Sequence, residues 1–151
     1  MGAPESGEIG RLIVAHALLP HPEGGFYREI YRDPGTVRDE TLDRARGAVS
    51  IILFLIPGCT PTRWHRVESC EIWHHLAGDP IQLEIGGETR IVEGDPVRAV
   101  AVVPAGVWQR ARSNGTWSLA SCTVAPAFDF SDFSLWEGPG DPPSLPSATG
   151  A

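Results

Sequence analysis

The chain has 151 residues, a formal net charge of −7 and 12 arginines, but it contains no lysine. A single domain with its own hydrophobic core is expected at this length, without disulfides to stabilise it. The negative charge argues against a nucleic-acid or anionic-membrane surface, and the absence of lysine excludes Schiff-base chemistry and cofactors that attach through a lysine.

The first element in chain order is a short amphipathic helix, predicted over residues 8–19 because apolar residues recur there at helical spacing. Pro20 and Pro22 are expected to end it. The apolar, β-branched run over residues 48–56 then predicts a strand that is buried on both faces.

Further short strands are expected after this run, separated by turn residues. They are predicted at residues 71–76, 81–85, 89–92, 97–103 and 117–124, with Gly86-Gly87 as a hairpin turn. Many short strands at this spacing are typical of an all-β sandwich or barrel. Residues 1–7 and the Pro-, Gly- and Ser-rich tail 136–151 are predicted to be disordered, which leaves residues 8–135 as the folded domain.

The three cysteines have no Cys-x-x-Cys spacing, so they predict neither a disulfide framework nor a zinc site. No basic and apolar leader opens the chain, and no apolar run approaches the roughly 20 residues of a membrane-spanning helix. We therefore expect a cytoplasmic protein with reduced thiols and with neither a membrane nor a nucleic acid as its partner.

The motif WHRVESCEIWHHLAG at 64–78 carries the first candidate functional residues. If His65 and Glu71 lie on successive strands, alternation places Val67 and Trp73 on the same inward face. A histidine and a carboxylate inside an apolar barrel form a metal site, an acid/base pair, or only a hydrogen bond between strands. Burial is expected to raise the pKa of the carboxyl and lower that of the imidazole, bringing both toward the neutral range.

The motif VVPAGVWQ at 102–109 supplies a third candidate polar group, Gln109, which can orient a substrate by donating and accepting hydrogen bonds. The alternative is a surface glutamine after a turn. His75 shares the strand parity of Glu71 and is placed at the rim of the pocket. Aromatic walls around a few polar groups are typical of a small-molecule pocket, although ordinary core packing also explains the tryptophans that flank these groups: Trp64, Trp73 and Trp108.

Four stretches together resemble one branch of the RmlC-like cupin superfamily, an uncharacterised conserved domain. They are HPEGGFYREIYR at 21–32, WHRVESCEIWHHLAGDP at 64–80, VVPAGVWQ at 102–109 and TVAPAFDFSDF at 123–133. The resemblance implies a cupin double-stranded β-helix, that is, a jelly-roll barrel, with a short N-terminal helix. It also implies a fold similar to that of deoxysugar epimerases, a homodimer, and a cavity in the mouth of the barrel.

The wider cupin pattern places three histidines and a glutamate around a metal. Here His65 and Glu71 match that pattern, whereas Val67 and Gln109 stand where histidines are expected. The resemblance therefore implies either no required cofactor or a weakly bound divalent metal, held by His65, Glu71 and Gln109. It also implies that Tyr27, together with Glu23, caps the cavity or crosses the dimer interface, and that the phenylalanines of residues 123–133 close the end of the barrel.

The first functional hypothesis is an epimerase, isomerase or lyase that acts on a small polar metabolite, either sugar-like or carbonyl-bearing. His65 would be the acid/base and Glu71 its partner or a second proton carrier. The substrate would be bound by Gln109, Trp73, His75, Arg63, Tyr27 and Trp108. The alternatives are a non-catalytic metabolite-binding cupin and a metal-dependent oxygenase.

Overall fold

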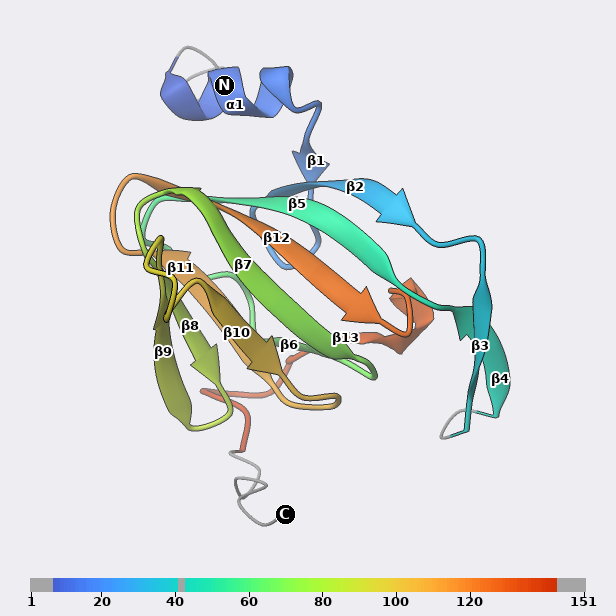
Figure 1. Ribbon diagram of the computed structural model, residues 1–151. Helices are drawn as coiled ribbons and strands as arrows, with labels where there is room; N and C mark the ends of the chain where they lie inside the picture. Colours follow the sequence, from blue (N-terminus) through green and yellow to red (C-terminus); the bar gives the residue numbers. More distant parts are fainter. Residues whose placement is uncertain (1–6, 41–42, 144–151) are drawn as a thin grey trace.

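The computed structural model of the protein describes residues 7–40 and 43–143, and most of its strands form two sheets that face each other as a jelly-roll barrel (Figure 1). The six-stranded sheet has the order β1 (Leu19–Pro20), β2 (Phe26–Arg32), β5 (Ser50–Pro57), β12 (Trp117–Ala125), β7 (Cys70–Gly78) and β10 (Val100–Val103). The five-stranded sheet has the order β13 (Phe133–Leu135), β6 (His65–Val67), β11 (Gln109–Ser113), β8 (Ile81–Ile85) and β9 (Glu88–Val92). This arrangement confirms the predicted all-β jelly-roll fold.

The core lies between the two sheets because the inward positions of the strands carry apolar side chains. Alternation is clearest in β8, where Ile81 and Leu83 are fully buried and Gln82 between them is not. The same alternation brings Glu71 of β7 and Gln109 of β11 into the interior. Polar groups therefore enter the barrel from both sheets.

Helix α1 (Glu8–Ala15) packs on the outer face of the six-stranded sheet (Figure 1). The predicted end of this helix at residue 19 was wrong by four residues. The chain turns at Ala17, whose φ is 51°, and the backbone N–H of Leu18 then donates to the carbonyl of Ile13 at 2.9 Å. This turn buries Leu18 against Leu55 of β5 instead of extending the helix.

The strongly apolar segments were predicted well, and the polar segments were not. The run at 48–56 becomes β5, where Phe54, Leu55 and Ile56 are buried in succession, so both faces are covered. The predicted strand 97–103 starts only at Val100 as β10, because Asp95 accepts hydrogen bonds from the backbone N–H groups of the two residues that begin the predicted strand. The strands that were not predicted are short, or rich in charged residues, or largely exposed: β1, β2, β6, β11 and β13, together with the β3 and β4 strands described next.

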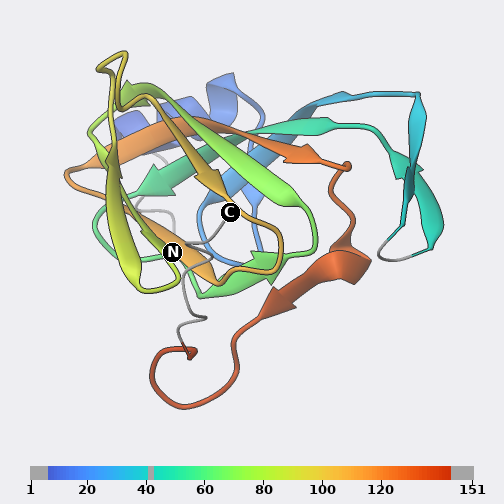
Figure 2. The ribbon, with the colours of Figure 1, turned by 60° about the horizontal axis from the view of Figure 1, so that its bottom comes forward.

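Strands β3 (Thr36–Asp39) and β4 (Arg44–Gly47) form a separate two-stranded arm that extends beyond the barrel (Figures 1 and 2). Arg46 ties this arm to the rest of the fold, and its side chain is only 4% exposed. Its guanidinium lies 3.1 Å from Asp39 and 2.6 Å from Asp132, and it donates to the Ala127 carbonyl at 2.6 Å. The arm is thereby fixed to the segment after β12, which contains the short 3₁₀ helix η1 (Phe130–Asp132).

Part of the predicted C-terminal tail is described, and it lies against the barrel. Asp141 accepts a hydrogen bond from the Trp64 indole N–H at 3.0 Å, and the Trp136 ring contacts Trp108 edge to face. Residues 1–6 and 144–151, which belong to the predicted disordered ends, lie outside the described residues. Within the described part of the chain, no helix is long and apolar enough to cross a membrane.

Candidate functional site

Polar side chains from both sheets surround a cavity of about 30 Å³ inside the barrel. Its polar lining is His21, Glu23, Tyr27, Ser50, His65 and Glu71, and its apolar lining is Ile52, Val67, Val124, Phe128 and Phe133. A space of this volume holds about one water molecule. It can therefore accommodate only the reacting end of a larger molecule.

His65 is placed at the first position of β6 and is 1% exposed. Its Nδ1 lies 2.9 Å from the carbonyl oxygen of Arg63. A carbonyl can only accept, so Nδ1 carries the proton and Nε2 of the neutral ring carries the lone pair. Nε2 is buried and has no hydrogen-bond partner among the described residues, and the ring lines the cavity, so this atom is available to a ligand.

Glu71 is held by a chain of hydrogen bonds that links the two sheets. The Trp73 indole N–H donates to Gln109 Oε1 at 3.0 Å, and Gln109 Nε2 donates to Glu71 Oε2 at 2.7 Å. An indole N–H can only donate, so it fixes the orientation of the Gln109 amide. The NH₂ group of Gln109 must therefore face Glu71.

Burial moves the pKa values of Glu71 and His65 in opposite directions. It raises the pKa of Glu71 from its ordinary value of 4.5 to about 7, against the opposing effect of the hydrogen bonds from Gln109 and Cys122. It lowers the pKa of His65 from 6.5 to about 4. The predicted directions are confirmed, but only the carboxyl moves toward neutral pH. The imidazole moves away from it, because its ordinary pKa already lies close to 7.

We expect this carboxyl to impose a pH dependence on stability. A carboxyl whose pKa is raised in the folded state favours folding most below its unfolded pKa, and this contribution disappears as pH rises through the folded pKa. For Glu71 that window runs from 4.5 to about 7, and the loss amounts to about 3 kcal/mol. Glu71→Gln removes this titration. The free energy of unfolding of the variant, relative to that of wild type, should therefore rise by about 3 kcal/mol between pH 4.5 and about 7.

Urea denaturation of both proteins at pH 4.5, 6 and 7.5 measures this difference. The lowered pKa values of His65 and His21 act in the opposite direction, but they are present in both proteins and cancel. A constant difference between the two proteins over this range would show that Glu71 does not titrate near neutrality.

Glu23 and His21 precede β2 and complete the polar lining. Glu23 Oε2 lies 3.0 Å from His65 Nδ1, and the Glu23 backbone N–H donates to His21 Nδ1 at 3.1 Å. Burial, and then the charge of Glu71, raise the pKa of Glu23 well above its usual range, although Thr62 opposes this shift with a hydrogen bond. This shift favours the proton-bearing form of Glu23, whose Oε2 lies beside His65 Nδ1.

His21 was not among the site residues predicted from the sequence. Its burial depends on the sharp turn that follows it, where the His21 N–H donates to the Gly25 carbonyl at 3.0 Å. A histidine two residues before a glutamate was the available signal, but nothing in the sequence indicated that this turn enters the barrel.

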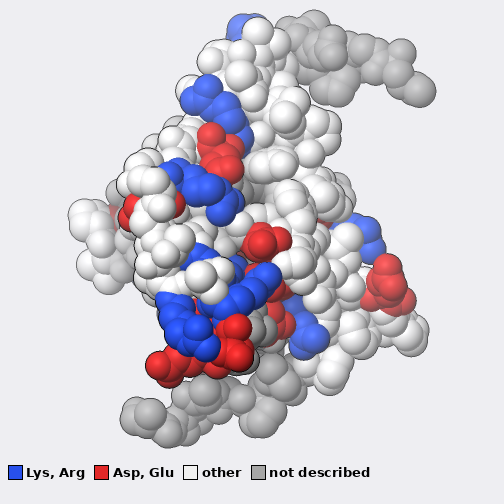
Figure 3. Space-filling view, turned by 90° about the vertical axis from the view of Figure 1, so that its right-hand side faces the viewer, with Lys and Arg blue, Asp and Glu red and all other residues white. Residues whose placement is uncertain are grey.

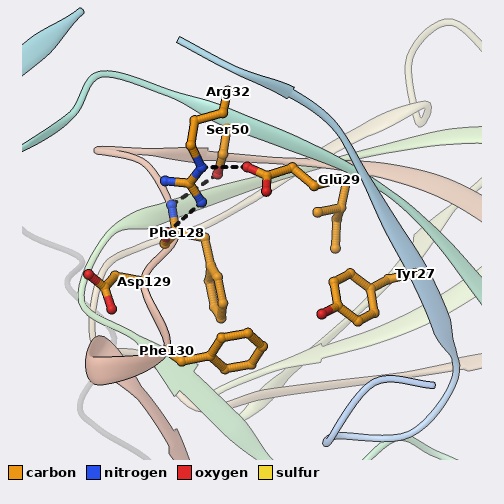
Figure 4. A pocket seen from close by; sticks show the side chains of 8 residues that line it. Tyr27, Glu29, Arg32, Ser50, Phe128, Asp129 and Phe130 are labelled. Atoms are coloured by element: carbon orange, nitrogen blue, oxygen red, sulfur yellow. Dashed lines mark hydrogen bonds and ion pairs between the residues drawn. The ribbon is translucent and has the colours of Figure 1, made fainter. Parts of the chain in front are cut away.

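A larger outer pocket of about 390 Å³ adjoins the cavity. Figure 4 shows its lining: Tyr27, Glu29, Arg32, Ser50, Ile52, Phe128, Asp129 and Phe130. Four of these residues, Tyr27, Ser50, Ile52 and Phe128, also line the inner cavity. They form a shared wall between the two spaces.

The structure brings together some of the predicted site residues and separates others. His65, Glu71 and Tyr27 line the cavity, and Gln109 and Trp73 support Glu71 from behind. The remaining three predicted substrate-binding residues do not reach it. Arg63 is exposed, His75 Nε2 lies 3.0 Å from the Asp79 carbonyl, and Trp108 packs beneath the guanidinium of Arg66.

Comparison with known proteins places this barrel in a family. Residues 10–136 match the family described as Cupin superfamily (DUF985). A hypothetical protein from Leishmania major is 30% identical, with 86% of this chain and 88% of that chain aligned and a TM-score of 0.77. A protein from Shewanella oneidensis is 31% identical over 83% of this chain and 82% of that chain, with a TM-score of 0.73.

The chain belongs to the DUF985 family of the cupin superfamily. A cupin 2 conserved barrel domain protein from Rhodopseudomonas palustris shares the fold at 16% identity, over 78% of this cupin and 75% of that chain, with a TM-score of 0.58. No curated protein matches the chain.

The donor set of this cupin does not fit the metal that its superfamily implies. Gln109 directs its NH₂ group at Glu71 and its oxygen at the Trp73 indole, and its side chain does not line the cavity, so its oxygen is not presented to an ion there. His65 keeps one free nitrogen, and Glu71 also accepts from Cys122. Within residues 7–40 and 43–143, no three His, Cys, Asp or Glu side chains form a group that could hold a metal ion.

Proposed function

We propose that this cupin is a proton-transferring isomerase, epimerase or lyase that acts on a small polar metabolite with a carbonyl group. One observation carries the proposal: a buried carboxyl with a pKa of about 7 and an unpartnered imidazole nitrogen line the same cavity. Buried polar atoms are normally hydrogen-bonded. Groups of this kind therefore mark the place where a ligand supplies the missing partners, and perturbed pKa values are typical of functional sites.

The chemistry follows from the charge state of each group. The Glu71 carboxylate removes a proton from the carbon beside the substrate carbonyl, the C–H electron pair forms the C=C bond of an enolate, and the C=O π pair moves onto the carbonyl oxygen. Glu23, in the protonated form that its burial favours, donates a hydrogen bond to the carbonyl oxygen as negative charge develops there. The protonated Glu71 then returns the proton to carbon, and His65 Nε2 accepts a hydrogen bond from a substrate hydroxyl.

Solvent exchange tests this proposal directly. The wild-type protein is incubated in D₂O with a panel of aldoses, ketoses and 2-oxo acids, and ¹H NMR follows the C–H group beside each carbonyl. At least one compound should exchange faster than in buffer alone. The rate should rise about tenfold per pH unit below 7 and then level off, because only the ionised form of Glu71 accepts a proton.

A panel member that binds without exchange would favour the non-catalytic metabolite-binding cupin instead, and no exchange in any member contradicts the proposal. The metal-dependent oxygenase is disfavoured by the orientation of Gln109. The homodimer expected from the family resemblance stays a prediction.

A further inference from the structure

The outer pocket has the size of a binding site for a whole small molecule, which the inner cavity lacks. Its volume of about 390 Å³ falls within the range of roughly 300–1,000 Å³ that is typical of ligand pockets. A ligand held there would have its reacting end beside the wall that the two spaces share. The pocket lining therefore selects the substrate, and this inference rests on the proposed function.

The charges of the pocket disfavour an anionic ligand. Arg32 is the only basic residue that lines the pocket. The Arg32 Nε donates to Glu29 at 2.6 Å, and the Arg32 Nη2 donates to the Phe128 carbonyl at 2.8 Å. Asp129 adds a second carboxylate, whose pKa is lowered by hydrogen bonds from Ser131. One cation against two carboxylates leaves the pocket with a net negative charge.

A cationic ligand gains little in this pocket, because Glu29 is already paired with Arg32 and the remaining carboxylate, Asp129, is exposed to solvent and screened. Figure 3 shows that this mixture of charges continues over the side of the molecule on which β3 and β4 lie, where arginine and carboxylate side chains lie next to each other. This face therefore has no single-sign field that would attract a charged ligand.

Three aromatic rings provide apolar contact area. Phe128 and Phe130 lie 4.8 Å apart at 85° and form a corner, and Tyr27 directs its hydroxyl toward them from across the pocket (Figure 4). The negatively polarised face of such a ring attracts C–H groups of a ligand. Glu29 and Arg32 lie at the other end of the pocket. The Glu29 carboxylate can accept hydrogen bonds from ligand hydroxyls, and the remaining N–H groups of Arg32 can donate to them.

We infer that the outer pocket binds an uncharged, polyhydroxylated ring, that is, a free sugar without a phosphate, carboxylate or amino group. The ring lays its C–H face on Phe128 and Phe130, and its hydroxyls bind Glu29 and Arg32. Its anomeric carbon, which becomes the carbonyl carbon when the ring opens, then lies toward the cavity that contains Glu71.

A matched set of ligands tests this inference with the full chain. Isothermal titration compares neutral D-glucose, D-galactose, D-xylose and L-rhamnose with anionic glucose 6-phosphate and glucuronate and with cationic glucosamine. At least one neutral sugar should bind, and glucose 6-phosphate, glucuronate and glucosamine should all bind at least about tenfold more weakly than that sugar. Equal or tighter binding of a charged sugar, or no binding of any neutral sugar, would overturn the inference.

Two variants locate the binding. Phe130→Ala removes a side chain that is 51% exposed and should weaken the neutral sugar by about tenfold, whereas Val97→Ala, at a position that is 89% exposed and outside the pocket, should not. Glu29→Gln removes the partner of Arg32 and should raise the affinity for glucuronate. If Phe130→Ala and Val97→Ala bind the sugar equally well, the pocket assignment is wrong.

The sugar-binding test of the outer pocket and the deuterium-exchange test of the proposed function can fail independently. Neutral sugars that bind without deuterium exchange would support the pocket assignment and contradict the catalytic proposal. Exchange in 2-oxo acids without binding of any neutral sugar would support catalysis and overturn the pocket assignment.

Discussion

Glu71→Gln is expected to slow the deuterium exchange of any active compound by about 10²–10⁴-fold, the usual contribution of a general acid/base. The substitution preserves shape and the hydrogen bond that Gln109 Nε2 donates at 2.7 Å, since an amide oxygen accepts as a carboxylate does. It removes only the ability to take up and release a proton at neutral pH. The exchange rate, measured by ¹H NMR at saturating compound, reports this loss.

The matched control is Glu88→Gln, which makes the same chemical change at a side chain that is 58% exposed on β9. This variant should exchange at the wild-type rate. Binding of the compound to Glu71→Gln should also stay near the wild-type affinity, which separates a lost proton carrier from a collapsed site. Exchange in Glu71→Gln within about threefold of wild type would remove Glu71 from the chemistry.

Arg46→Met is expected to lower the free energy of unfolding by about 3–5 kcal/mol. The guanidinium is almost fully buried and contacts Asp39, Asp132, Ser69 and the Ala127 carbonyl. Methionine fills much of the same space but leaves buried carboxylates without this cation, and an uncompensated buried charge is costly. Urea denaturation at pH 7 measures the change.

Arg38→Met provides the comparison for this prediction, because Arg38 pairs with Asp43 on the same arm but is 68% exposed. Its effect should stay within about 0.5 kcal/mol of wild type. Similar losses in the two variants would mean that the buried network does not anchor the arm. Because Arg46 also holds Ala127, next to Phe128, Arg46→Met should weaken ligand binding in the outer pocket.

Strand patterns that depend on apolar alternation could be predicted from the sequence. The bounds of β8 agree with the prediction at both ends. Strand parity correctly predicted that His65, Val67, Glu71 and Trp73 are buried, although the first two lie on the inner face of one sheet and the last two on the inner face of the other. These predictions succeed because a strand with one buried face must repeat apolar residues with a period of two.

The composition of the site could be predicted only in part, because several of its members depend on long-range packing. His21 enters the barrel through a turn, and Phe133 reaches His65 through the pairing of β13 with β6. Gln109 was expected to contact substrate, but in the structure it contacts Glu71 and Trp73. His75 has the parity of Glu71, yet its position toward Asp79 takes it away from the cavity.

The hydrogen bonds of Gln109 also bear on how the barrel is completed. They join β11 of one sheet to β7 of the other through atoms of the chain itself. A single neutral amide therefore cross-links the two sheets, and the contact that joins them also positions the carboxyl that lines the cavity.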